Sequence, residues 1–141
     1  MKLLVVEDDP LIGPAMRAVL SGAGYTVLGP VRDATKAMRF ADAGHLDLAL
    51  VDYSLAGGQD GLCVVRQLAA VHGIPSLLVT GFDHRADDIR DLALGILHKP
   101  FSPTALIGAV EAVGALLTGN APSSVPMSLK LFRTSAGKVQ G

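Results

Sequence analysis

The chain has 141 residues, half of them hydrophobic, and a formal net charge of −1. This length favours one compact domain whose core is large enough to be stable alone. The near-neutral charge gives no reason to expect binding to nucleic acid or to an acidic membrane surface. Because Cys63 is the single cysteine, no internal disulfide can form.

The start of the chain does not resemble a targeting signal. Glu7 interrupts the first apolar segment, Leu3–Val6, whereas a signal peptide needs a longer apolar stretch. No apolar run in the sequence approaches the roughly 18 residues of a membrane span. We therefore expect a cytoplasmic protein that makes no contact with a membrane.

Strand and helix patterns alternate along the first part of the chain, which predicts an α/β domain with a doubly wound parallel sheet. The expected strands are short aliphatic runs. They lie at residues 3–6, 25–28, 46–51, 76–80 and 96–98. The expected helices carry apolar residues at helical spacing, and the fourth is short. They lie at about residues 10–20, 33–43, 62–71, 86–92 and 103–117.

Local signals mark where some of these helices begin. Ser102 followed by Pro103 gives a capping side chain and then a proline in the first turn. Asp33 can cap the second helix in the same way. Asp9 can cap the first helix, but Pro14 removes a hydrogen bond from a helix interior, so we expect this helix to start late or to bend.

The helix expected at 103–117 has an apolar stripe wider than one packed face requires. Either the tail of the chain folds back over this helix or a second subunit covers it, as in a homodimer. Residues 119–141 are expected to be a linker and a C-terminal tail, too short to hold an effector domain. Within this tail, Leu129, Leu131 and Phe132 form a small apolar anchor.

Polar residues of complementary type follow four of the expected strands. Glu7 and Asp8 follow the first, Asp52 follows the third, Thr80 ends the fourth, and Lys99 follows the fifth. In an open α/β sheet, ligands bind outside the carboxyl ends of the strands. We therefore expect these side chains to form one site.

Three carboxylates in one site need a counter-charge. At about 4 Å and an effective dielectric near 20, each like-charge pair costs about 4 kcal/mol before screening. Protonation or a hard cation would hold such a cluster together, and Mg²⁺ suits a site made of few carboxylates. With Mg²⁺, the Lys99 ammonium and the Thr80 hydroxyl could contact the oxygens of a phosphoryl group. Asp52 is best placed to accept that group as an aspartyl phosphate.

Four motifs carry a specific resemblance to a known family. They are L-V-V-E-D-D-P, D-L-A-L-V-D-Y-S-L, L-L-V-T-G and H-K-P-F, in this order along the chain. Together they resemble the receiver domain of a two-component response regulator over residues 1–118. The V-T-G-F stretch is similar to a subgroup in which the threonine has F-A-T-G-Y-like surroundings. The resemblance implies a flavodoxin-like, five-stranded parallel sheet with strand order 2-1-3-4-5 and about five helices.

The resemblance also implies roles for residues at matching positions. Asp52 would be the phosphoacceptor, Thr80 the switch hydroxyl, and Lys99 the lysine that pairs with the phosphoryl group. The Lys99–Pro100 peptide bond is cis in this family. One position departs from the family pattern, because Ile96 stands where an aromatic residue is usual. Phe82 could supply an aromatic side chain from the neighbouring loop instead.

The metal ligands follow from the same resemblance. Glu7 and Asp8 would be the acidic pair, with Asp8 binding Mg²⁺ directly and Glu7 acting through water. Asp52 and the backbone carbonyl of Ser54 would complete the metal shell.

The implied function is signalling. A histidine kinase or histidine phosphotransfer protein would phosphorylate Asp52, and the altered surface would bind an unidentified output protein. The chain would catalyse only its own phosphorylation and dephosphorylation, and no direct DNA binding is expected. One alternative is a Mg²⁺-dependent phosphohydrolase, although Asp52-Tyr53-Ser54 lacks the second carboxylate that such enzymes use. Another is a pseudo-receiver that works without phosphorylation, which the complete acidic set disfavours.

Overall fold

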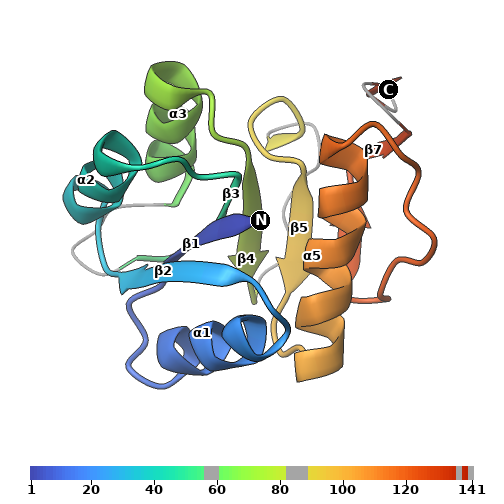
Figure 1. Cartoon of the computed structure of the whole chain (residues 1–141), viewed down its shortest axis with the longest axis horizontal. Coiled ribbons are helices and arrows are strands. Elements are labelled where there is room, and N and C mark those ends of the chain that lie inside the picture. The colour runs from blue at the N-terminus through green and yellow to red at the C-terminus, as the bar shows by residue number, and fades with distance from the viewer. Residues whose placement is uncertain (56–60, 82–88, 136–137, 140–141) are drawn as a thin grey trace.

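A computed structural model describes residues 1–55, 61–81, 89–135 and 138–139 (Figure 1). Its centre is a six-stranded sheet with strand order β2-β1-β3-β4-β5-β6. The strands are β1 (Lys2–Val6), β2 (Thr26–Val31), β3 (Leu48–Asp52), β4 (Ser76–Thr80), β5 (Gly95–His98) and β6 (Leu129–Leu131). Strands β1 to β5 pair in parallel, which confirms the expected order of the five strands. Near the end of the chain, β7 (Arg133–Ser135) and β8 (Lys138–Val139) form a separate antiparallel pair.

Helices cover both faces of the sheet. They are α1 (Ile12–Gly22), α2 (Ala34–Ala43), α3 (Gly61–His72) and α5 (Pro103–Leu117). Helices α1 and α5 lie on one face, and α2 and α3 lie on the other (Figure 1). Residues 86–88 of the fourth expected helix lie outside the described residues, and residues 89–92 form a turn in which the Leu92 N–H donates to the Ile89 carbonyl at 2.9 Å. None of the described helices has the length and apolar character needed to cross a lipid bilayer.

The central strands explain why their sequences are continuously apolar. Successive side chains of a strand point to opposite faces, and here both faces are covered. Leu4 and Val6 of β1 join the apolar layer beneath α2 and α3, whereas Leu3 and Val5 join the layer beneath α1 and α5. All four side chains are fully buried, so β1 needs no polar face.

The structure confirms the sequence signals for two helix starts. The Ser102 hydroxyl accepts a hydrogen bond from the Ala105 N–H at 3.0 Å, and Pro103 is the first residue of α5. The Asp33 carboxylate accepts a hydrogen bond from the Lys36 N–H at 2.9 Å. Each cap satisfies a donor that the first helical turn leaves without a partner.

Helix α1 starts late, as the proline in its sequence predicts. It begins at Ile12, so Pro14 lies in its first turn, where a proline removes no hydrogen bond. The Asp9 carboxylate accepts hydrogen bonds from the N–H groups of Leu11 and Ile12, at 2.8 and 3.0 Å. These bonds lower the pKa of Asp9. Because the helix begins at Ile12, the N-cap position is Leu11 and not Asp9 as expected, and Asp9 binds the start of the helix from two residues further back.

Strand β2 extends beyond the residues predicted for it, to Val31 rather than Leu28. Its pairing with β1 is irregular, because the register shifts between Leu4 and Val6. Gly29 lies at this irregularity with a φ of +93°, and a Cβ there would lie 2.5 Å from the Val5 carbonyl oxygen. Only glycine fits this backbone at this distance, so the strand continues through Gly29, beyond Leu28, where the sequence predicted it to end.

The tail of the chain returns to the body of the domain. Strand β6 pairs with β5 in the antiparallel direction and adds a sixth strand that the sequence did not predict. Leu129 and Phe132 are buried, which confirms the expected apolar anchor. Before β6, the chain passes over α5, where Pro126 lies close to Gly108. The tail therefore covers part of the wide apolar face of α5.

Candidate phosphorylation site

Polar side chains from four strands meet at one edge of the sheet. Asp52 is the last residue of β3, and Glu7 and Asp8 directly follow β1. Thr80 is the last residue of β4, and Lys99 directly follows β5. These positions share one edge because the four strands are parallel neighbours. The placement agrees with the cluster that the sequence predicts.

Lys99 joins two of the carboxylates. Its ammonium lies 2.8 Å from an oxygen of Glu7 and 3.6 Å from an oxygen of Asp52. Glu7 and Asp52 are both buried, and Lys99 is partly exposed. A buried carboxylate is expensive unless it has a counter-charge, so this lysine neutralises part of the site.

The three acidic residues could hold a metal ion. Glu7, Asp8 and Asp52 each offer a carboxylate oxygen, and these oxygens lie within 4.8 Å of one another. Mg²⁺ binds through oxygen ligands and keeps several waters, so few protein ligands are enough. The set contains oxygen donors alone, which fits Mg²⁺ better than zinc.

Burial and charge shift the pKa of two groups here. Burial raises the pKa of Glu7 from 4.5 to about 7, and the neighbouring Asp52 acts in the same direction. Burial alone would lower the pKa of Lys99, but its hydrogen bond to Glu7 and the charges of both carboxylates outweigh this and raise the pKa. The site therefore favours the protonated, cationic form of Lys99. It disfavours ionisation of Glu7, which would place a negative charge beside Asp52.

Backbone hydrogen bonds fix the start of the site at β1. The Glu7 N–H donates to the Val31 carbonyl at 2.9 Å, and this bond ties the residue after β1 to the end of β2. The second oxygen of Glu7 accepts a hydrogen bond from the Asp9 N–H at 3.2 Å. Glu7 is thus held by its own backbone and by its side chain.

The position of Asp52 is fixed in a similar way. The next residue, Tyr53, donates its N–H to the Val79 carbonyl at 2.9 Å, and the Ser54 N–H donates to Asp52 at 3.2 Å. The start of α3 also approaches closely, since a Cβ on Gly61 would lie 2.1 Å from the Asp52 carbonyl oxygen. The metal-binding role of the Ser54 carbonyl stays a prediction.

The residues around Thr80 combine features that the resemblance implies with one position, Ile96, that departs from the family pattern. Thr80 is buried, and its carbonyl accepts a hydrogen bond from the Lys99 N–H at 2.8 Å. The Lys99–Pro100 bond is cis, as the resemblance implied. Ile96 is buried in the layer beneath α2 and α3. Phe82, the suggested substitute for the missing aromatic residue, lies outside the described residues.

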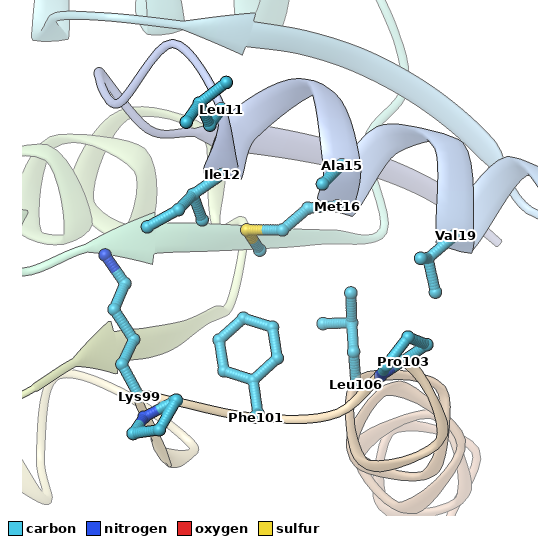
Figure 2. A pocket seen from close by; sticks show the side chains of 10 residues that line it. Leu11, Ile12, Ala15, Met16, Val19, Lys99, Phe101, Pro103 and Leu106 are labelled. Carbon is cyan, nitrogen blue, oxygen red and sulfur yellow. The ribbon is translucent and has the colours of Figure 1, made fainter.

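An apolar groove that the sequence did not reveal lies beside Lys99. It has a volume of about 330 Å³ and runs between α1 and the segment that leads into α5. Ile12 and Met16 face it from α1, and Phe101 faces it from the opposite side (Figure 2). Leu11 stands at its rim and is 80% exposed. An exposed apolar surface next to a reactive site is typical of a place where a partner docks.

The chain matches the response regulator receiver domain family over residues 3–111. It therefore belongs to this family. Receiver domains are signalling phosphoacceptors that bind Mg²⁺ through acidic residues, and the clustered acidic residues fit this description.

Individual relatives agree with this assignment. The receiver is 32% identical over 112 residues to the phyllosphere-induced regulator PhyR of Methylorubrum extorquens. This alignment covers 78% of this chain and 42% of PhyR. It is 32% identical over 114 residues to the regulatory protein VanR of Enterococcus faecium, which covers 79% of this chain and 48% of VanR. The chain thus spans about half the length of these curated relatives.

A solved structure supports the same fold. The signal receiver domain of a modulated diguanylate cyclase from Desulfovibrio desulfuricans is 32% identical and superposes with a TM-score of 0.69. The alignment covers 78% of this chain and 90% of that domain. The alignments with PhyR and VanR span 112 and 114 residues, and the family match ends at residue 111, before the strand β6.

Proposed function

We propose that this receiver accepts a phosphoryl group on Asp52 from the phosphohistidine of a histidine kinase or a phosphotransfer protein. An Asp52 oxygen forms a bond to phosphorus, the P–N bond to the donor breaks, and its electron pair returns to the imidazole. The observation that carries this proposal is the Lys99 ammonium placed between Glu7 and Asp52, at 2.8 and 3.6 Å. A cation in this position can form an ion pair with the negatively charged oxygens of the new phosphoryl group.

Residues around Asp52 have distinct parts in this proposal. Lys99 would move its contact from the carboxylates to a phosphoryl oxygen, and the Thr80 hydroxyl would donate to another. Glu7, Asp8, Asp52 and the backbone carbonyl of Ser54 would hold Mg²⁺, which would supply a further positive charge for the phosphoryl oxygens. We place the receiver in residues 1–118 and treat residues 119–141 as a linker and tail.

The groove gives the protein donor a place to dock. Lys99 forms one end of the groove (Figure 2). Because Lys99 also contacts Asp52, a partner bound in the groove would have its phosphohistidine near Asp52. The exposed Leu11 adds apolar surface at the rim. Phosphorylation would then bias the receiver toward a second conformation that an output protein binds more tightly.

The proposal is tested by incubating the chain with acetyl phosphate, with and without Mg²⁺, and measuring its intact mass. We expect the mass of one phosphoryl group to appear only with Mg²⁺, and to be absent from Asp52→Asn. No mass gain in the wild type would contradict the proposal and favour a pseudo-receiver. Steady release of phosphate from a small phosphomonoester would favour a phosphohydrolase.

A further inference from the structure

Strand β5, which leads to Lys99, is held on both sides by backbone hydrogen bonds. On one side, the Lys99 N–H donates to the Thr80 carbonyl at 2.8 Å. On the other side, the N–H of the preceding residue, His98, donates to the Ser128 carbonyl of the tail at 2.9 Å. The backbone that carries the reactive lysine therefore lies between β4 and the tail.

The tail is anchored on both faces of the sheet. Leu129 joins the apolar layer beneath α1 and α5, whereas Phe132 joins the layer beneath α2 and α3. Phe132 is only 2% exposed, and its N–H donates to the Leu94 carbonyl at 3.0 Å. It lies in the same apolar layer as Ile96, the residue that replaces the usual aromatic side chain of the family. The tail thus brings an aromatic ring into that layer.

Two glycines in the body of the domain make room for this segment. A Cβ on Gly95 of β5 would lie 2.5 Å from the Lys130 carbonyl oxygen, and a Cβ on Gly108 of α5 would lie 2.9 Å from Pro126. Neither glycine has a positive φ, so the backbone conformation does not require glycine there. What these positions require is space for the tail. The domain is therefore shaped to receive residues 126–132 at two separate places.

We propose that residues 126–132, the tail segment, position Lys99 for the phosphoryl group, so that docking of this segment and occupancy of the Asp52 site favour each other. This inference rests on the proposed function. In the docked state Lys99 already points into the site and contacts Glu7 and Asp52. Releasing the tail removes the hydrogen bond that the His98 N–H donates to the Ser128 carbonyl, which leaves the backbone at Lys99 fixed only by its bond to Thr80. Linkage requires that the effect be reciprocal.

The experiment measures binding of beryllium fluoride with Mg²⁺, a phosphoryl mimic, to the full chain by NMR titration. Phe132→Asp places a charge in a buried position of the tail, and Gly108→Leu pushes Pro126 away while leaving the tail sequence intact. Gly22→Leu is the matched control, because a Cβ there meets no atom within 4 Å. Hydrogen exchange of the amide of residue 132 reports whether the tail is docked.

We expect both tail variants to bind beryllium fluoride at least about fivefold more weakly, and the control to bind as the wild type does. Binding of Mg²⁺ alone should not weaken, because its expected ligands Glu7, Asp8 and Asp52 follow or end β1 and β3 and are not part of the tail segment. A general loss of structure would weaken both. In the wild type, beryllium fluoride should slow exchange at Phe132 by the same factor.

Unchanged beryllium fluoride affinity in variants that have lost amide protection at residue 132 would overturn this inference alone. A wild type that neither binds beryllium fluoride nor accepts a phosphoryl group would overturn the proposed function, and this inference with it.

Discussion

The Lys99 ammonium lies 2.8 Å from Glu7, although the two residues are 92 positions apart in the chain. This contact joins the end of β1 to the end of β5 across the carboxyl edge of the sheet. It makes one carboxylate and one ammonium close partners within the site. During phosphorylation, Lys99 is expected to contact the phosphoryl group and Glu7 to help hold Mg²⁺. The two residues can therefore be tested separately.

We predict that Lys99→Met separates phosphorylation from metal binding. Without the ammonium, phosphorylation of Asp52 by acetyl phosphate should slow about 100-fold, because a preorganised cation is lost. Mg²⁺ should bind more tightly, since Lys99 no longer competes for the Glu7 oxygen. Phosphorylation is followed by intact mass, and Mg²⁺ binding by calorimetry. Lys36→Met, which removes a lysine on the exposed side of α2, should change neither.

Weaker Mg²⁺ binding in Lys99→Met would contradict this account. It would mean that the lysine orders the acidic residues rather than competing with the metal.

The raised pKa of Glu7 predicts a pH-dependent stability. In the folded chain without metal this pKa is about 7, whereas the ordinary value is 4.5. Between these values the folded state binds the proton more tightly, so its advantage is fully present below about pH 4.5 and is lost as the pH rises through about 7. The difference corresponds to at most roughly 3 kcal/mol.

This prediction is checked by urea unfolding in EDTA at several pH values, with Glu7→Gln as the reference that cannot ionise. The wild type should lose free energy of unfolding relative to Glu7→Gln as the pH rises. Two parallel curves between pH 4.5 and 8 would show that Glu7 ionises as it does in an unfolded chain.

Gly13 is predicted to set how closely α1 approaches the acidic residues. A Cβ there would lie 2.9 Å from the Pro30 ring and 3.5 Å from the Glu7 side chain. Gly13→Ala should therefore destabilise the fold by roughly 1–3 kcal/mol and weaken Mg²⁺ binding. Gly22→Ala, in the same helix but in open space, should instead stabilise the chain by about 0.5–1 kcal/mol. Urea unfolding and Mg²⁺ titration of both variants measure these effects.

If Gly13→Ala behaves as Gly22→Ala does, the ring of Pro30 can move aside without cost. The spacing between α1 and β2 would then have no part in placing Glu7.

Much of the fold followed from local sequence. Ser102 and Asp33 predicted where their helices begin, because an N-cap contact lies within one helical turn and so depends only on neighbouring residues. The sequence also predicted that Glu7, Asp52 and Lys99 lie close together, although they are distant along the chain. Parallel strands carry their carboxyl ends to the same edge, so the polar residue after each strand was enough.

What the sequence could not show depends on partners far along the chain. Strand β6 has three residues with Lys130 at its centre, and such a segment forms a strand only because the edge of β5 is there to pair with it. The extension of β2 through Gly29 depends on the neighbouring backbone of β1. The groove beside Lys99 arises from side chains on two elements, and no single stretch of sequence contains it.

The groove gives the last prediction, which concerns how the receiver selects its phosphodonor. Leu11→Asp places a charge at the apolar rim, so a protein donor that docks there should transfer its phosphoryl group about 10-fold more slowly, equivalent to about 1.4 kcal/mol of lost transition-state stabilisation. Phosphorylation by acetyl phosphate should stay unchanged, because a small donor needs no docking surface. Val71→Asp is the control, since Val71 is an exposed apolar residue on α3, on the opposite face of the sheet.

The measurement compares transfer from a phosphorylated histidine phosphotransfer protein with transfer from acetyl phosphate, for the wild type and both variants. A loss confined to Leu11→Asp and to the protein donor would place docking in the groove. An equal loss with both donors would mean that the charge disturbs Asp9 and the start of α1, since Leu11 donates its N–H to Asp9. An equal loss in Val71→Asp would move the docking surface to the α3 side of the sheet.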